Sequence, residues 1–434
     1  MYRRQNLIAA AVCFVFFLFL YGITSRGKLQ ASDEAAVFAS GISLANTGHL
    51  AIDQLKPLQE KVNLGREGPD GHLYTKYFPG NVFAVALVYK LTARSDDQPY
   101  IWNTEIAPSL TGARWALQLN TFWGALGMTA LLFMIRRFLE WRTAVITVVL
   151  IGLCSDWWYQ SRGLYSEVAA GALATWSLVF ALSERIYSGS ALLAISSLFR
   201  PTTLLALPFI GNVVRQKPRP TIVCAIIIAT GLLGLAAYNY SRFRSPFIFG
   251  YPGGNLSVPL LSGLFVLFFS PGRSIFVYSP ILLLAIPGAW FFLKRDKSTP
   301  LFCLFFIVGH VLIVACWGPL GWGLSWGSRL MTLTLPVFGL LVAAGIERIW
   351  RSKWWRPVPI LLGMLGFAVQ VLTLARDPTH VLIDRVQSGD VKFEETVYSA
   401  RHCWLSLQVE AARNRQPCEL DSYMLRRLLT NCPD

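Results

Sequence analysis

Residues 220–238 read PTIVCAIIIATGLLGLAAY, an apolar run without a single charged side chain. An α-helix needs about 20 such residues to cross the hydrocarbon core of a bilayer, which is roughly 30 Å thick. Residues 168–182 (VAAGALATWSLVFAL) form a second block of this kind. The whole chain is 54% hydrophobic and 15% charged, whereas soluble proteins average about 25% charged residues. This composition excludes a disordered chain, a coiled coil, collagen and a secreted disulfide scaffold, and it predicts an all-α polytopic membrane protein.

Similar apolar runs along the chain predict about eleven transmembrane helices. Residues 7–23 follow Arg3 and Arg4, and we interpret them as a retained anchor because residues 28–31 (KLQA) are a poor signal-peptide cleavage site. Residues 81–91 are apolar but too short to cross, so we expect an interfacial or re-entrant helix there. The other predicted spans are residues 113–135, 143–157, 165–183, 186–199, 201–214, 220–238, 275–293, 300–317, 330–346 and 357–375.

Basic residues between the apolar runs predict the topology. The net charge of +15 could indicate nucleic-acid binding, but Lys and Arg separate the apolar blocks instead of forming one stripe, so no nucleic-acid partner is expected. Short cytoplasmic loops are rich in Lys and Arg. The basic turns share one side if residues 186–214 form a hairpin with Arg200 at its outer tip, which puts the N-terminus in the cytoplasm and the tail outside. These turns contain Arg136, Arg137, Arg142, Arg185, Arg215, Lys217, Arg219, Lys294, Arg295, Lys297, Arg348, Arg351, Lys353 and Arg356.

This topology divides the chain into two parts. Residues 1–376 would form the transmembrane domain, with residues 24–112 as a long first exoplasmic loop, and residues 377–434 an exoplasmic tail. An oxidising exterior would allow two of Cys403, Cys418 and Cys432 to form a disulfide, holding amphipathic segments such as residues 397–407 against the outer cavity. No cysteine or histidine cluster has the spacing of a metal site.

Two acidic positions on the predicted outer side are candidates for chemistry. Ser32, Asp33 and Glu34 open an amphipathic stretch that ends at Gly48. The pattern is typical of helix capping, with Ser32 as the N-cap and two acids in the first turn, but an acid at the membrane surface could also serve as a general base or a cation ligand. Glu167 stands at the outer end of an apolar run, where a carboxylate is costly and often functional, unless it simply reaches the aqueous interface.

Outer-side cations and tryptophans are candidates for binding. Lys76, within YTKYFPG (74–80), could snorkel to the interface or bind a lipid phosphate. Arg273 and Arg329 could also bind a phosphate, because arginines are less common on the outer side of membrane proteins than on the cytoplasmic side. Tryptophans in this region could form an aromatic belt or stack on a sugar, and they are Trp317, Trp322 and Trp326.

In this order, these residues resemble the GT-C superfamily of membrane glycosyltransferases, which includes the protein O-mannosyltransferases and the lipid A aminoarabinose transferases. The family places an Asp-Glu pair at the start of an amphipathic helix after the first span, as Asp33 and Glu34 stand here. Lys76 before Tyr77 matches a basic residue that faces lipid phosphate, and Glu167 matches a second acidic position where many relatives have Asp. The resemblance covers the first 200 residues best, and no single motif in it is specific.

The resemblance implies a hexosyl- or pentosyltransferase of a bacterial inner membrane. Such an enzyme moves a sugar from a polyprenyl-phosphate donor to a glycan, lipid or protein acceptor on the outer face, by an inverting single displacement with Asp33 as base. Some relatives use a divalent metal such as Mg or Mn and others do not. The implied catalytic residues are Asp33, Glu34 and Glu167, and the implied substrate-binding residues are Lys76, Tyr77, Tyr165, Arg200, Arg273, Trp326 and Arg329.

Two other classes of function stay open. A secondary transporter or flippase for a lipid-linked or small anionic substrate would predict repeated halves and broken helices with ionisable groups at the midplane. The sequence shows no internal repeat, although the segment around Arg200 is broken. A non-catalytic lipid-binding or scaffold protein would use the outer acids only for capping and solubility. An Asp33→Asn variant that folds but is inactive would discriminate against both.

Overall fold

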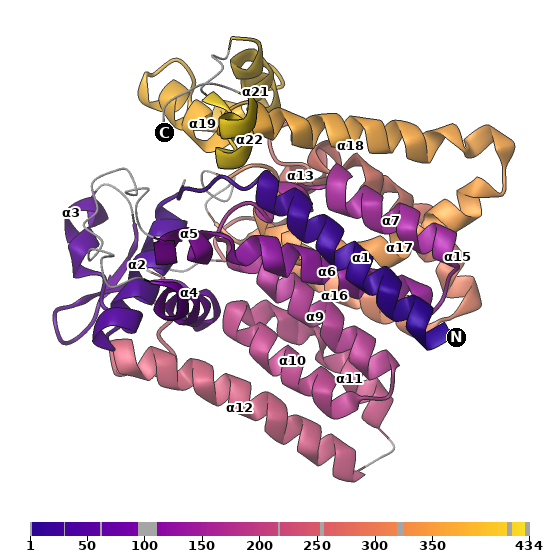
Figure 1. The fold of residues 1–434 in the computed structure, drawn as a ribbon, viewed down its shortest axis with the longest axis horizontal. Helices are drawn as coiled ribbons and strands as arrows, with labels where there is room; N and C mark the ends of the chain where they lie inside the picture. The colour runs from indigo at the N-terminus through magenta and orange to yellow at the C-terminus, as the bar shows by residue number, and fades with distance from the viewer. Residues whose placement is uncertain are drawn as a thin grey trace.

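The computed structural model describes residues 2–29, 31–60, 63–93, 111–215, 218–251, 256–318, 325–414 and 419–429. Helices dominate, as predicted, and the strands within these ranges are one short antiparallel pair, β1 (Gly65–Glu67) and β2 (Leu73–Thr75). Figure 1 shows a bundle of helices with smaller helices grouped at one end. The prediction of an all-α polytopic membrane protein is therefore confirmed.

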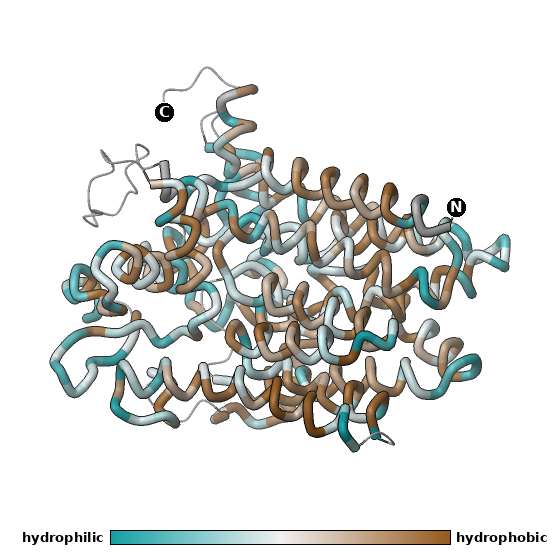
Figure 2. Tube along the Cα trace, turned by 60° about the horizontal axis from the view of Figure 1, so that its bottom comes forward, coloured by the Kyte–Doolittle hydropathy of each residue, from teal (hydrophilic) through white to brown (hydrophobic). Residues whose placement is uncertain are grey.

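Six helices in the described ranges are long and apolar enough to cross a membrane. Large apolar side chains are exposed on several of them, as on α1 and α12, and Figure 2 shows hydrophobic residues along most of the bundle. The six segments are Gln5–Ile23 in α1 (Tyr2–Ile23), Arg114–Arg136 in α5 (Thr111–Leu117) and α6 (Leu119–Arg136), Pro218–Phe243 (α12), Ser298–Cys316 (α16), Arg329–Trp350 in η4 (Arg329–Thr334) and α17 (Leu335–Trp350), and Lys353–Ala375 in η5 (Lys353–Trp355) and α18 (Pro357–Ala375).

Shorter apolar helices complete the bundle. The predicted hairpin of residues 186–214 is present: α10 (Ile186–Phe199) ends at Arg200, and η2 (Pro201–Ala206) with α11 (Leu207–Val214) follows. The ring of Pro201 cannot continue the α10 hydrogen-bond ladder, which explains the break. The other short apolar helices are α7 (Trp141–Cys154), α9 (Ser166–Leu182) and α13 (Leu260–Phe269).

Two segments differ from the sequence prediction. Residues 275–293 were expected to form one span, but the structure has α14 (Ile275–Tyr278), η3 (Pro280–Leu284) and α15 (Ala285–Arg295). Pro280 follows Ser279 in a non-helical conformation (φ −142°, ψ 67°), so the helix cannot run through this point. Helix α13 was not predicted, because ten apolar residues are too few for a span.

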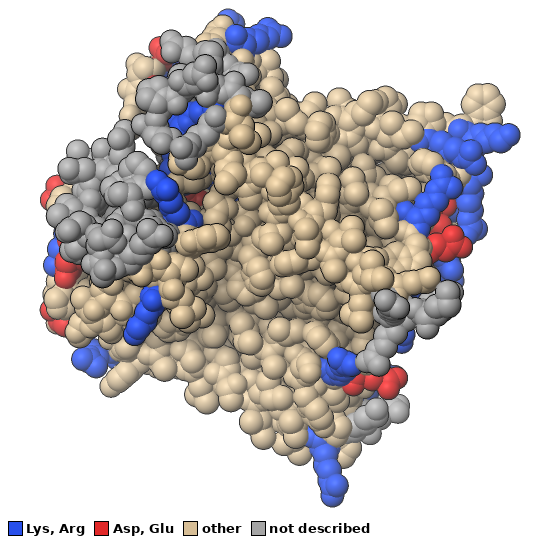
Figure 3. All heavy atoms as spheres, in the orientation of Figure 1, with Lys and Arg blue, Asp and Glu red and all other residues tan. Residues whose placement is uncertain are grey.

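The two ends of the bundle differ in character. The N-terminus lies at the right of Figure 1, whereas the first-loop helices and the tail helices lie at the left. Figure 3 shows Lys and Arg at the right-hand end and also at the left-hand end, with an uncharged belt between them. The right-hand group agrees with the grouping of basic turns, while the side that faces the cytoplasm stays a prediction. The first-loop helices are α2 (Ser32–Thr47), η1 (Asp53–Leu55), α3 (Lys56–Gln59) and α4 (Pro79–Thr92), and the tail helices are α19 (Pro378–Gln387), α20 (Phe393–Tyr398), α21 (Trp404–Arg413) and α22 (Tyr423–Leu429).

The tail is folded against the bundle. Val397, Trp404 and Leu407 are buried, although residues 397–407 are not one helix, since a turn separates α20 from α21. Cys403 is a free, buried thiol, and the other two tail cysteines of the predicted disulfide, Cys418 and Cys432, lie outside the described residues. Contacts other than a Cys403 disulfide therefore hold these helices in place.

Helix α9 and the segment η4 come into close contact through a glycine. A Cβ added at Gly171 on α9 would lie 2.7 Å from the carbonyl oxygen of Leu333 in η4. Only a residue without a side chain permits this approach. The contact joins the helix that carries Glu167 to the segment that begins with Arg329.

We expect Gly171→Ala to lower the unfolding free energy by about 1–3 kcal/mol, because η4 must move away from α9 to accommodate the methyl group. Thermal unfolding of the purified protein in detergent would measure this loss. Gly211→Ala is the matched control, since nothing lies within 4 Å of a Cβ at Gly211 on α11, and Ala favours a helix more than Gly does. Equal melting temperatures for the two variants would contradict the close contact.

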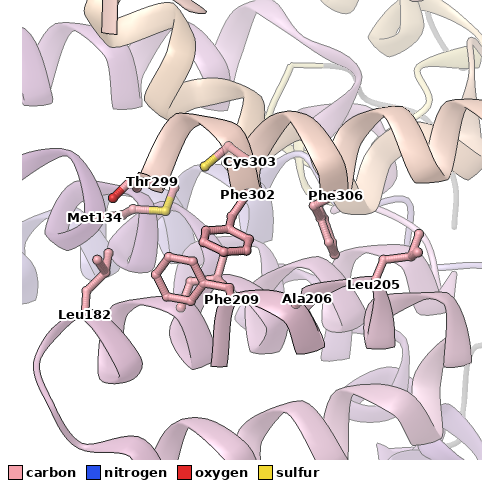
Figure 4. Close-up of a pocket in the computed structure, with 10 residues that line it drawn as sticks. Met134, Leu182, Leu205, Ala206, Phe209, Thr299, Phe302, Cys303 and Phe306 are labelled. Carbon is pink, nitrogen blue, oxygen red and sulfur yellow. The ribbon is translucent and has the colours of Figure 1, made fainter. Parts of the chain in front are cut away.

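One small gap in the core is only a packing defect. It has a volume of about 10 Å³, and Figure 4 shows Phe209 of α11 and Phe302 of α16 beside it. Their ring centroids are 5.5 Å apart and the rings are perpendicular. An apolar space of this size holds at most about one water molecule, so it is no candidate for a ligand site.

Candidate active site

Helix α2 presents the Asp-Glu pair at the end of the bundle that carries the first loop. It begins at Ser32, and Ala31 occupies the N-cap position without a side-chain hydrogen bond, so the predicted N-cap role of Ser32 is wrong. Asp33 and Glu34 lie in the first turn, where the helix dipole favours negative charge. The helix ends as predicted at Gly48, whose φ of 76° is left-handed and whose N–H donates to the Leu44 carbonyl at 3.1 Å.

Asp33 is the centre of a charged cluster. Its Oδ2 lies 2.9 Å from Nη1 of Arg329, and the Tyr77 hydroxyl donates a hydrogen bond to the carboxylate. Burial raises the pKa of Asp33, but the positive charges of Arg329 and Lys76 and the hydrogen bond from Tyr77 outweigh it, so the pKa is lowered overall. The carboxylate is therefore ionised at neutral pH.

Arg329 and Arg200 extend this cluster to the second acid. Nε of Arg329 lies 3.6 Å from Oε1 of Glu167, and Arg200 forms an ion pair with the same oxygen. Nε of Arg200 also donates to the Ser166 hydroxyl at 2.8 Å, and the Arg329 guanidinium lies 4.4 Å from the centroid of the Tyr165 ring. The structure thus brings four predicted residues, on α2, η4, α9 and the turn after α10, into one chain of ion pairs.

Lys76 adds a third cation to the cluster. Its Nζ donates to the Asn63 carbonyl at 2.6 Å and lies 5.4 Å and 5.9 Å from the ring centroids of Tyr77 and Tyr251. Burial lowers the pKa of Lys76, and the charge of Asp33 opposes this effect. Lys76, Arg200 and Arg329 together face only two carboxylates, so the cluster has an excess positive charge that suits an anion such as phosphate.

Glu34 does not join this cluster, although it follows Asp33 in sequence. Its Oε1 accepts a hydrogen bond from the Leu164 amide at 2.8 Å and lies 3.8 Å from Nη1 of Arg26. Arg26 in turn contacts Asp421 of the tail. Glu34 therefore connects the first loop to the rest of the fold.

Arg273 and Trp326 lie apart from the Asp33 cluster. Arg273 is buried and donates hydrogen bonds to the carbonyls of Ser325 and Gly327, and its guanidinium lies 4.6 Å from the centroid of the Trp404 ring. Trp326 is fully buried, with its ring perpendicular to that of Tyr278 at 4.9 Å. Both residues fix the segment that leads into Arg329. Trp322 lies outside the described residues.

A cavity of about 310 Å³ lies beside Glu167 and Arg200. This volume falls within the usual range for ligand pockets, about 300–1,000 Å³. Sequence reasoning missed that His310 and Tyr251 line this cavity, although a histidine within an apolar span is itself a signal of function. The other lining residues are Phe78, Pro201, Thr202, Phe249, Ile313, Val314, Trp317, Leu330 and Leu333.

The residues of the cluster do not fit a divalent metal ion in this arrangement. Arg329 is bound to both Asp33 and Glu167, so a cation already occupies the space between the two carboxylates. Across the part of the chain that the structure describes, no three His, Cys, Asp or Glu side chains come together as metal ligands would. We therefore assign no step of the chemistry to a metal.

Comparisons with known proteins identify the fold. No protein-family model matches the sequence, and no curated protein matches it either. Among solved structures, ArnT from Cupriavidus metallidurans bound to undecaprenyl phosphate has a TM-score of 0.54 and 12% identity, with 98% of this chain and 84% of ArnT covered. The apo oligosaccharyltransferase of Archaeoglobus fulgidus has a TM-score of 0.55 and 14% identity, with 86% of this chain covered.

A third structure agrees with these two. Archaeal oligosaccharyltransferase AglB from Archaeoglobus fulgidus, in complex with an inhibitory peptide and a dolichol-phosphate, has a TM-score of 0.58 and 9% identity over 85% of this chain. The chain spans 58% and 55% of the chains in the two Archaeoglobus structures. At these identities the likeness concerns the fold alone, and this chain has the fold of ArnT and of the archaeal oligosaccharyltransferase.

Proposed function

We propose that the chain is a membrane glycosyltransferase that transfers a sugar from a polyprenyl-phosphate donor to an acceptor on the outer face of the membrane. The observation that carries the proposal is the chain of ion pairs that runs from Asp33 through Arg329 to Glu167 and Arg200, because the last two residues line an apolar cavity. The cavity is suited to the first isoprenoid units, and the surplus cations are suited to the phosphate. The bound lipids of the similar structures, undecaprenyl phosphate in ArnT and dolichol-phosphate in AglB, support this choice of donor.

Asp33 is the proposed general base because an acceptor can reach it. Its side chain is 22% exposed, whereas that of Glu167 is 0% exposed. In the reaction, the acceptor oxygen bonds to the anomeric carbon, the bond from that carbon to the phosphate oxygen breaks, and Asp33 takes the acceptor proton. The electron pair of the broken bond stays on the leaving phosphate, whose charge the neighbouring cations stabilise.

Arg329 would link donor binding to the strength of this base. A carboxylate with a lowered pKa is a weak base, and Arg329 and Lys76 are the charges that lower the pKa of Asp33. A donor phosphate that draws Arg329 away from Asp33 would raise this pKa and strengthen the base. The base would then be activated only when the donor is bound.

The proposal is tested with purified protein in lipid nanodiscs and undecaprenyl phosphate as the probe. We expect saturable binding and a higher melting temperature, because a ligand that binds only the folded state stabilises it. Cells that lack the protein should also accumulate a polyprenyl-linked sugar. A flippase would bind the same lipid, but it would move the intact donor across the membrane without releasing free polyprenyl phosphate. Absence of binding, or translocation of the donor without transfer, would overturn the proposal.

Arg200→Gln should weaken binding of undecaprenyl phosphate about ten- to a hundredfold, because a hydrogen bond to a charged group contributes about 1.5–3 kcal/mol. Titration of the lipid into nanodiscs, followed by intrinsic fluorescence, would measure the change in Kd. Arg295→Gln is the matched control, since Arg295 forms a more exposed ion pair with Glu347 on the helices α15 and α17. Equal affinities for the two variants would reject the role of Arg200.

A further inference from the structure

One wall of the 310 Å³ cavity carries a histidine with an unused ring nitrogen. His310 of α16 is 1% exposed, and its Nδ1 lies 2.8 Å from the carbonyl oxygen of Phe306. A carbonyl oxygen can only accept, so Nδ1 carries the proton, and the neutral ring presents Nε2 as an acceptor. Nε2 has no hydrogen-bond partner among the described residues.

Glu167 contributes a second unused acceptor to the same cavity. Its Oε1 receives Arg200 and lies near Arg329, but Oε2 is buried and finds no hydrogen-bond partner in the described part of the chain. A buried acceptor without a donor costs about 1–3 kcal/mol. Both atoms are enclosed, but both residues line the same cavity, so we expect a ligand with hydrogen-bond donors to reach them there.

The character of these atoms restricts the chemistry of the ligand. A phosphate diester offers only acceptors, so it can pair with Arg200 but not with His310 Nε2 or Glu167 Oε2. An isoprenoid chain offers neither donors nor acceptors, and it suits the apolar side chains such as Ile313 and Leu333. The groups that fit the two free acceptors are hydroxyl or amino groups, which a sugar carries close to its phosphate.

We propose that His310 is a specificity-determining residue that accepts a hydrogen bond from a hydroxyl or amino group on the sugar of the lipid-linked donor. The cavity then receives the donor with its phosphate at Arg200, its sugar between Glu167 and His310, and its first isoprenoid units on the apolar wall. The inference rests on the proposed function and adds the residue that recognises the glycosyl group. It predicts that the site binds the loaded lipid more tightly than the discharged one.

The test compares loaded and discharged lipids on the full-length protein in nanodiscs. The probes are undecaprenyl phosphate and undecaprenyl phosphate carrying glucose, mannose or arabinose, and the measured quantity is the ratio of the two Kd values. The native protein should prefer at least one of the three loaded lipids. For that lipid, His310→Leu should reduce the preference about tenfold, the value of one lost hydrogen bond of about 1.4 kcal/mol, with the affinity for undecaprenyl phosphate unchanged.

Two further variants keep the result interpretable. His310→Gln retains an acceptor near the position of Nε2 and should restore most of the preference, which a purely structural role would not predict. Ile313→Val removes one methylene from the same wall and should lower the affinity for all the lipids by the same factor. Thermal unfolding of each variant checks that it folds. If His310→Leu does not fold, His310→Phe, which also lacks a hydrogen-bond acceptor, replaces it in the comparison.

Each outcome is decisive. A native protein that prefers none of the loaded lipids, or a His310→Leu variant that keeps the full preference, overturns the role of His310 while the proposed function stands. A native protein that binds neither undecaprenyl phosphate nor any loaded lipid refutes the proposed function itself. A lost preference in His310→Leu, with its recovery in His310→Gln, supports the inference.

Discussion

Replacing Asp33 with Asn is expected to leave the protein folded and to lower sugar transfer at least about a hundredfold, the usual contribution of a general base. The amide keeps the size of the side chain and can still accept from Arg329 and Tyr77, but it cannot take a proton from the acceptor. The affinity for undecaprenyl phosphate should change much less than the rate, because the phosphate contacts cations and not Asp33. Release of free polyprenyl phosphate from a loaded lipid would measure the rate.

The control for this variant is Glu67→Gln, which removes an exposed carboxylate from β1 of the same loop and should leave transfer unchanged. The pH profile adds a second readout. Since the pKa of Asp33 is lowered, the base is deprotonated above that value and transfer should fall only in strong acid. The acid limb of kcat/KM should move to higher pH in Arg329→Gln, because this variant loses the positive charge that contributes most to lowering the pKa of Asp33. Near-normal transfer by folded Asp33→Asn protein would remove Asp33 from the mechanism.

Much of this site was predictable from sequence because its signals are local. A short stretch of sequence is enough to identify a carboxylate at the end of an apolar run, as at Glu167. The same holds for the helix break at Arg200, before Pro201. The charge of the turns placed these residues at one end of the molecule. The structure shows that Asp33, Glu167, Arg200 and Arg329 meet there in ion pairs, which the sequence did not predict.

Other features could not be predicted because they depend on the direction of a side chain. Neighbouring residues on an α-helix point about 100° apart, so the two acids at the start of α2 leave the helix in different directions. Asp33 faces Arg329, and Glu34 faces Arg26 and the Leu164 amide. His310 lies in an apolar helix, and only the tertiary structure shows that its ring borders a cavity.

The largest expected loss of stability comes from the tail, at Asp421. This carboxylate is buried, and its Oδ2 lies 3.0 Å from Nη2 of Arg162 and 3.6 Å from Nε of Arg26. Arg162 also donates to the Thr24 carbonyl at 2.6 Å and to the Thr373 hydroxyl at 2.9 Å. One acid thus joins the tail, the loop after α1, the turn after α8 (Asp156–Gln160) and the end of α18.

Asp421→Ala is expected to lower the unfolding free energy by about 3–5 kcal/mol, because it leaves two buried guanidinium groups without their shared partner. Backbone contacts beside it, from the Asp421 amide to Leu374 and from the Tyr423 amide to Ser25, should weaken together with the ion pairs. Chemical or thermal unfolding of the purified protein would measure the loss, and limited proteolysis should then cut the tail first.

Glu419→Gln is the control for Asp421→Ala, since Glu419 is partly exposed and lies 3.7 Å from Arg376, where an ion pair contributes about 0–1 kcal/mol. The Asp421 variant should also lower transfer, because Arg26 connects Asp421 to Glu34 in the helix turn that holds Asp33. If the tail were not packed against the bundle, both variants would have the melting temperature and the transfer rate of the native protein. A loss confined to Asp421→Ala would make the tail part of the fold that positions the base.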